Sequence, residues 1–267
     1  MQAAWHASDG LFYMCTIAIL VGVTDAPVVL AANRDELYAR PTRPPEILGP
    51  RIVGGRDVLS GGTWMALRDD GQFAAVTNQR ALEQAPPGLR SRGLAVMECA
   101  SAEDQDAYVR GLDPKRYASM NLVYGSASQV SVAYLRRESG ESEILRLGPG
   151  IHVLCNDVIG AAGFPRGERL HGLITAALAD RPAWPVLWPR LAAALGDHAR
   201  VELAATPPSS LPPALANQLT AICIHGEHYG TRSASLVALD PGRVRDYLAS
   251  DGSPGDTAFT DRIGLFS

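Results

Sequence analysis

Cys15 and its neighbours are the part of this 267-residue sequence whose types and spacing are best suited to chemistry. Cys15 follows an internal methionine, Met14, and a leading methionine is removed when the next residue is small. If translation starts at Met14, Cys15 becomes the first residue of the chain. Its thiol is then a nucleophile, and its free α-amine, with a pKa of about 8, can take the thiol proton. A buried strand cysteine without chemistry is the alternative interpretation of Cys15 taken alone.

A second polar segment, Asn33 to Glu36, follows an apolar run at 28–32. An arginine such as Arg34 stabilises a nearby thiolate, and an aspartate such as Asp35 can orient an α-ammonium group or hold its proton. Arg34 and Asp35 can equally form a surface ion pair at a solvated strand end. The segment is therefore a candidate partner for Cys15, with a purely structural alternative.

Two further patterns bear on binding. Gly61 and Gly62 allow a tight bend or a close approach of backbone, and Trp64 beside them either lines a pocket or packs in the core. His225 and His228 flank an expected turn and can in principle bind a metal ion or haem. Isolated surface histidines are much commoner, so we expect no metal site and no cofactor.

Short apolar runs separated by turn residues predict the elements that must position these groups. Runs of hairpins with helices grouped between them favour an α+β fold with mainly antiparallel sheets. Two such sheets packed face to face, with helices outside, would bury the apolar strands on both sides. The expected strands are 16–23, 28–32, 63–67, 72–77, 120–124, 130–136, 143–147, 151–154, 220–225 and 231–240; the expected helices are 93–111, with Ser101 as a cap, 167–179 and 185–195; loops are expected at 40–50, 81–92 and 203–214.

The composition excludes several function classes. Hydrophobic residues make up 46% and charged residues 19%, as in a globular protein. The net charge is −4 and no Lys/Arg cluster occurs, which argues against a nucleic-acid partner. The longest apolar run has the length of a strand, so no membrane span is expected. The four cysteines form no C-x-x-C pair, which argues against a zinc site and a disulfide scaffold and favours a reducing cytoplasm.

The chain reads as a short extension followed by a single domain at 15–267. Residues 1–14 lack a basic cluster before an apolar core, unlike a secretory signal. They fit a start-site extension, a tag remnant or a pro-segment. No linker divides the remainder, and no pattern indicates an oligomeric state.

Five short motifs follow one another along the chain: Met14-Cys15-Thr16, Ala32-Asn33-Arg34-Asp35-Glu36, Gly61-Gly62-Thr63-Trp64, Thr77-Asn78 and Gly230-Thr231-Arg232-Ser233. Taken in this order, they resemble the motifs of the NRDE family, also called TANGO2-like after a transport and Golgi organisation protein. The match runs from Met14 to the C-terminus. It departs from the family in the thirteen residues before Met14, and at Phe164-Pro165-Arg166, where a Trp-Pro-Lys segment is expected.

That family in turn resembles the N-terminal-nucleophile (Ntn) hydrolases, especially the penicillin V acylases and bile-salt hydrolases. The resemblance implies a four-layer αββα sandwich of two mainly antiparallel sheets. It also implies substrate contacts from Asn33, Trp64 and Thr77. The catalytic residues that it implies are Cys15, Arg34, Asp35, Asn78, Asn156 and Arg232.

Under this resemblance each polar residue has a chemical role. Asn78 and Asn156 each follow an expected strand and can donate to a developing oxyanion, and Asn156 can alternatively hold the α-amine. Arg232 can tune the thiolate or anchor a substrate carboxylate. The structural alternatives are turn residues that cap their strands, for the asparagines, and a cross-strand ion pair, for the arginine.

The resemblance implies a cytoplasmic amidohydrolase that cleaves a linear amide through a thioester on Cys15. The alternative is a non-catalytic protein that handles an apolar ligand, such as haem or an acyl group, in the ancestral pocket. A redox-sensing thiol protein is a third alternative.

Overall fold

Two antiparallel sheets form the body of the protein in a computed structural model that describes residues 15–79 and 86–266. The expected extension, residues 1–14, and residues 81–85 of an expected loop lie outside the described residues. The first sheet has the order β10-β1-β2-β11-β12-β13 and the second the order β3-β4-β5-β6-β7-β8-β9. The strands are β1 (Thr16–Val21), β2 (Val28–Leu37), β3 (Thr42–Gly49), β4 (Ile52–Asp57), β5 (Met65–Arg68), β6 (Phe73–Asn78), β7 (Met120–Ser126), β8 (Gln129–Arg136), β9 (Glu141–Arg146), β10 (Gly150–Leu154), β11 (Tyr229–Asp240), β12 (Arg243–Ser250) and β13 (Thr260–Asp261).

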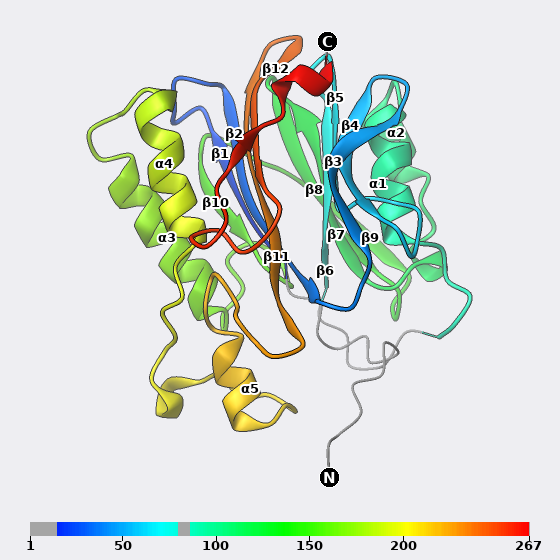
Figure 1. Ribbon diagram of the computed structural model, residues 1–267. Helices are drawn as coiled ribbons and strands as arrows, with labels where there is room; N and C mark the ends of the chain where they lie inside the picture. Colours follow the sequence, from blue (N-terminus) through cyan, green and yellow to red (C-terminus); the bar gives the residue numbers. More distant parts are fainter. Residues whose placement is uncertain (1–14, 80–85, 267) are drawn as a thin grey trace.

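Helices cover the outer face of each sheet, as Figure 1 shows, with α3 and α4 on one side and α1 and α2 on the other. In the described part of the chain, none of these helices is long and apolar enough to cross a membrane. The helices are α1 (Arg92–Ser101), α2 (Gln105–Arg110), α3 (Pro165–Ala177), α4 (Trp184–Leu195) and α5 (Pro213–Gln218), and the 3-10 turns are Pro114–Arg116, Leu203–Ala205 and Ile263–Phe266.

The central strands of each sheet are buried on both faces, which explains their continuous apolar runs. Ile19 of β1 packs into the core between the sheets with Leu67 of β5. Its neighbour Leu20 points the other way, against Leu170 of α3 and Leu187 of α4, because successive strand side chains alternate between faces. A third cluster joins the second sheet to α1. The expected four-layer αββα sandwich is confirmed.

Strand β2 is longer than the sequence predicts, and its added part carries the polar motif. The expected strand ends at residue 32, whereas β2 runs to Leu37 with Asn33 to Glu36 buried. It pairs with β1 through Asn33 and with β11 along its whole length. The polar segment is therefore part of a central strand and not a solvated strand end.

The expected loop at 40–50 is wrong in part, because Thr42–Gly49 forms strand β3. β3 is an edge strand, paired only with β4, and its ladder is irregular near Pro45 and Gly49. An edge position tolerates the missing N–H groups of prolines. Strand β4, its partner, is absent from the expected elements.

The strand expected at 220–225 is wrong, whereas the one expected at 231–240 is part of β11. Residues 220–225 contain no strand and make one isolated bridge, His225 to Gly230. β11 pairs instead with β2 and with β12, whose sequence was not expected to form a strand. Apolarity at 220–225 reflects burial of this segment near α4, where Ile222 packs in the outer core.

The single expected helix at 93–111 is two helices. Ser91 caps α1 by accepting a hydrogen bond from the Leu94 N–H, and Asp104 caps α2 by accepting one from the Ala107 N–H. Ser101 is the last residue of α1 and not an N-cap. The caps satisfy N–H groups that a helix start leaves without partners.

The first turn of α1 packs directly on the glycine pair before Trp64. A Cβ on Gly62 would lie 2.4 Å from the carbonyl carbon of Gly93. The Thr63 N–H donates to the Gly93 carbonyl at 3.2 Å. Only a residue without a side chain fits at position 62, and this contact fixes α1 against the loop that carries Trp64.

We expect Gly62→Ala to lower the free energy of unfolding by about 1–3 kcal/mol because backbone must move to admit a methyl group. The matched control is Gly172→Ala in the middle of α3, where an added Cβ meets no atom within 4 Å. That change should raise stability by about 1 kcal/mol through helix propensity. Urea unfolding measures both, and a Gly62→Ala protein as stable as the wild type would contradict the close contact.

Candidate active site

Cys15 lies at the start of β1, beside the polar segment of β2. Thr16 pairs with Asn33, so the antiparallel register puts Cys15 across from Arg34 and next to Asp35. A cavity of about 530 Å³ lies at this point, beside the start of β1 and the last part of β2. Cys15, Arg34, Asp35, Trp64 and Asn78 line this cavity. The fold therefore brings the expected nucleophile together with four of its expected partners.

Arg34 is held rigidly between neighbours from several strands. Its guanidinium carbon lies 4.5 Å from the centre of the Trp64 ring, within cation–π range. One terminal nitrogen donates to Thr42 Oγ1 at 3.0 Å, and the other lies 3.4 Å from Glu36 Oε2. A fixed cation beside Cys15 favours the thiolate form of a nucleophile.

Trp64 owes its position to a missing side chain on β4. A Cβ on Gly55 would lie 2.0 Å from the indole ring, so the ring packs directly on the backbone of this strand. Arg34 then stacks against the same indole. Gly55 therefore shapes the cavity indirectly, because it allows Trp64 to pack against β4.

Asp35 is a buried carboxylate with partners from two other elements. Thr231 Oγ1 of β11 donates to Asp35 Oδ1 at 2.6 Å, and Arg166 of α3 lies 3.6 Å from Oδ2. Burial raises the pKa of Asp35 to about 7, against the opposing effects of Arg166 and Thr231. This carboxyl group therefore changes charge near neutral pH.

The thiol of Cys15 is weakly acidic in this environment. Burial, and then the charge of Asp35, raise its pKa to about 11, although the Asp35 backbone N–H and Arg34 act in the opposite direction. At neutral pH such a thiol is almost entirely protonated. A nucleophilic Cys15 needs a base that takes its proton.

Arg166 is a site residue that the sequence analysis did not select. It is 1% exposed, pairs with Asp35 and donates to Asn156 Oδ1 at 2.5 Å. Asn156 in turn donates from Nδ2 to the Asn78 carbonyl at 2.8 Å. The sequence signal that could have indicated Arg166 was the Phe164-Pro165-Arg166 segment. It has an arginine at the position where the family resemblance leads us to expect a lysine.

Asn156 and Arg232 are not among the described residues that line the cavity. Asn156 supports it from behind through Asn78 and Arg166. Arg232 lies where the pairing of β11 with β2 shifts register, and it donates to the Tyr38 carbonyl at 2.5 Å. Thr231, its neighbour, is the residue of this motif that contacts Asp35.

Asn33 and Thr77, the expected substrate contacts besides Trp64, are buried hydrogen-bonding residues. Asn33 Nδ2 donates to the carbonyls of Leu195 and Ile222. Thr77 Oγ1 donates to the Cys155 carbonyl at 2.7 Å, which ties β6 to the segment after β10. Neither residue lines the cavity among its described residues.

The sequence matches the family model for Transport and Golgi organisation 2 over residues 14–248. The chain belongs to the TANGO2 family. Curated relatives include Transport and Golgi organization 2 homologues from Bos taurus and Mus musculus. The first is 27% identical over 252 residues and the second 28% identical over 256 residues, and each match covers 86% of this chain and 90% of the relative.

Two solved structures share the fold of this TANGO2-family protein. Both are variants of conjugated bile acid hydrolase from Clostridium perfringens. One has a TM-score of 0.53 at 9% identity and covers 95% of this chain and 94% of its own. The other has a TM-score of 0.51 at 11% identity and covers 92% of both chains. The Ntn-hydrolase-like fold implied by the sequence is confirmed.

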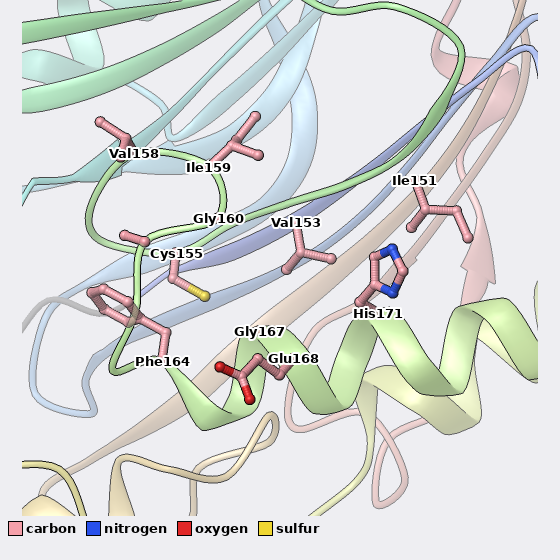
Figure 2. A pocket seen from close by; sticks show the side chains of 11 residues that line it. Ile151, Val153, Cys155, Val158, Ile159, Gly160, Phe164, Gly167, Glu168 and His171 are labelled. Atoms are coloured by element: carbon pink, nitrogen blue, oxygen red, sulfur yellow. The ribbon is translucent and has the colours of Figure 1, made fainter.

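The TANGO2-family chain has a second cavity of about 420 Å³ between β10 and α3. Figure 2 shows Val153 and Ile159 on one side and Phe164, Glu168 and His171 on the other. Apolar side chains with a few polar groups are typical of small-molecule pockets. Cys155 lines this cavity, so the segment that supports Asn78 also borders it.

We expect Arg166→Met to lower the free energy of unfolding at pH 8 by about 3–5 kcal/mol, because Asp35 stays buried without its cation. The loss should be smaller at pH 5. Removing the cation raises the pKa of Asp35 further above its value in the unfolded chain, about 4, so stability falls as pH rises between these values.

Urea unfolding at the two pH values measures this difference. The control is Arg232→Met, which removes a half-buried arginine from the same region and should cost about 1 kcal/mol or less at either pH. Equal losses for Arg166→Met at pH 5 and pH 8 would show that Arg166 does not act through the charge of Asp35.

Proposed function

We propose that this protein is a cytoplasmic Ntn-type cysteine amidohydrolase that cleaves a linear amide through a thioester on Cys15. The observation that carries the proposal is the convergence of Cys15, Arg34, Asp35 and Asn78 on one cavity. The solved structures with this fold are named as hydrolases of conjugated bile acids, and hydrolysis of a small conjugate is the class of reaction proposed here. All four cysteines are free, which agrees with a reducing compartment.

Because burial raises the pKa of the Cys15 thiol, this thiol needs a base, and the proposal assigns that role to the α-amine of the same residue. A free α-amine has a pKa of about 8 and can accept the thiol proton directly. Asp35 Oδ2 makes no hydrogen bond among the described residues and lies next to Cys15 in the strand register. It would hold the α-ammonium group that forms.

The reaction then follows in two halves. The Cys15 sulfur bonds to the amide carbon, and the carbonyl oxygen becomes an oxyanion toward which Asn78 can donate. The carbon–nitrogen bond breaks, and the leaving amine takes the proton from the α-ammonium. A water molecule, deprotonated by the same α-amine, hydrolyses the thioester and restores the thiol.

The proposal requires Cys15 at the N-terminus. The family match begins at residue 14, which supports Met14 as the start of the functional chain. With residues 1–14 attached, the nitrogen of Cys15 is an amide without a basic lone pair. The extension should then block the reaction while the rest of the cavity stays intact.

We expect a chain that starts at Met14 to lose this methionine, as intact-mass measurement would show, and to release amine from a panel of N-acyl amides. The chain that keeps residues 1–14 should be slower by at least about 1000-fold, since it lacks the base. Cys15→Ala should abolish turnover. Cys99→Ala, a change at a buried cysteine of α1, is the matched control and should remain active.

Two results would count against this function. One is a Cys15→Ala protein of unchanged stability that turns over every amide as fast as the wild type. The other is full activity in a chain whose residues 1–14 are shown by mass to be present.

The apolar cavity beside α3 favours a second candidate function, in which the protein binds an apolar ligand such as haem or an acyl group without catalysis. In that case haem added to micromolar protein should show a shifted Soret band. His171→Ala, which changes the cavity wall, should remove the shift, and Cys15→Ala should leave it. A wild-type protein without any shift would remove haem from consideration.

A further inference from the structure

Three side chains of types that can bind metal ions, from two segments of the chain, meet outside both cavities. His198 follows α4, while Cys223 and His225 precede β11. Each offers one ligand atom, and these atoms all lie within 4.8 Å of one another. Cys223 is buried and the two histidines are exposed, so the group opens to solvent on one side. None of these three residues has a role in the proposed hydrolysis.

The distances within this group fit a tetrahedral metal ion. Cys223 Sγ lies 3.7 Å from His225 Nε2. Zinc–sulfur and zinc–nitrogen bonds of about 2.3 and 2.1 Å at a tetrahedral angle place sulfur and nitrogen about 3.6 Å apart. The His198 and His225 rings face the same space, with centroids 4.3 Å apart. Small side-chain rotations therefore bring the three ligand atoms to bonding distance of one ion.

The tautomer of His198 is suitable for coordination. Its Nδ1 lies 3.2 Å from the Cys223 carbonyl oxygen, which can only accept a hydrogen bond. Nδ1 therefore carries the proton and Nε2 keeps its lone pair. A ring nitrogen that donates to a backbone carbonyl, opposite the metal-binding nitrogen, is the usual arrangement around a bound ion.

Backbone contacts hold the three segments together without a metal ion. The Cys223 N–H donates to the Asp197 carbonyl at 2.9 Å. Gly196 packs on the turn after β12 so closely that a Cβ there would lie 2.8 Å from the Pro254 carbonyl oxygen. The same turn carries Ser253, whose hydroxyl lies 3.1 Å from Cys223 Sγ and 2.5 Å from His225 Nε2. The backbone contacts thus hold the segments of the site together, and a bound metal ion would replace the hydrogen bonds of Ser253.

We propose that His198, Cys223 and His225 bind one zinc ion. One thiolate and two imidazoles form a borderline-soft ligand set, which suits zinc and does not suit magnesium or calcium. Asp256 Oδ2 lies 3.3 Å from His225 Nε2 but outside the group of three ligand atoms, and a water molecule would take the fourth position. The thiolate balances one of the two positive charges, the nearby Asp256 carboxylate offsets the other, and the Cys223 thiol proton is released on binding.

The zinc site adjoins the network around Asp35 through one residue. Ile224, between the two ligands on the chain, donates from its N–H to Thr231 Oγ1 at 2.9 Å, and this hydroxyl donates to Asp35 Oδ1. An ion on Cys223 and His225 would restrain the segment that positions Thr231. The site therefore has a structural role, and its existence does not depend on the proposed hydrolysis.

Cobalt(II) serves as the spectroscopic probe for this site. We expect the metal-free protein to bind one equivalent, with a sulfur-to-cobalt charge-transfer band in the near ultraviolet and visible d–d bands of tetrahedral intensity. One equivalent of zinc should displace it. Cys223→Ala should remove the charge-transfer band, and His198→Ala and His225→Ala should each weaken zinc binding by at least about 10-fold.

His228→Ala is the matched control, because His228 is an exposed histidine in the same turn and outside the ligand group. It should bind cobalt like the wild type. Zinc should raise the midpoint of thermal unfolding of the wild type and of His228→Ala, but not of His225→Ala. Because His225 is exposed, its replacement by alanine should leave the protein folded, so misfolding would not explain the missing effect of zinc. A charge-transfer band that persists in Cys223→Ala, or disappears in Cys15→Ala, would overturn the assignment, as would the absence of stoichiometric binding.

Discussion

The burial of Asp35 is the constraint on which the rest of the site depends. A carboxylate in the interior is costly unless hydrogen bonds and a cation compensate it. Thr231 supplies the hydrogen bond from β11 and Arg166 the cation from α3. Arg166 also holds Asn156, which holds the Asn78 backbone of the other sheet. Through one buried charge, both sheets and helix α3 are fixed relative to Cys15.

The sequence predicted most of the fold because both sheets are covered on both faces. Strands such as β1 and β8 then read as apolar runs bounded by turn residues. The prediction of strands failed at segments whose structure depends on whether a neighbouring strand pairs with them. Edge strand β3 contains two prolines yet pairs with β4, and the apolar segment 220–225 is buried without joining a sheet. The local amino-acid composition predicts neither of these two outcomes.

The site residues that lie on neighbouring paired strands were predictable from the sequence. Cys15 and the β2 motif meet because β1 and β2 are consecutive antiparallel strands, a relation that short sequence separation already implies. Arg166 and Thr231 lie far along the chain, and a buried arginine at a helix start looks like a surface one in sequence. Arg232 was chosen by motif, yet the register shift in β11 turns its neighbour toward Asp35 instead.

In the proposed reaction, the charges of the cavity would favour proton transfer from the Cys15 thiol to its own α-amine. This transfer would create a thiolate and an ammonium group side by side. Arg34 would stabilise the thiolate and Asp35 the ammonium group, since both residues line the cavity with Cys15. Without that ammonium group, burial raises the pKa of Asp35. A nearby ammonium group would lower the pKa of Asp35 again, because it stabilises the charged carboxylate. Under the proposed mechanism, exposure of the Cys15 amine would therefore complete the arrangement of charges that Arg34, Asp35 and Arg166 already form.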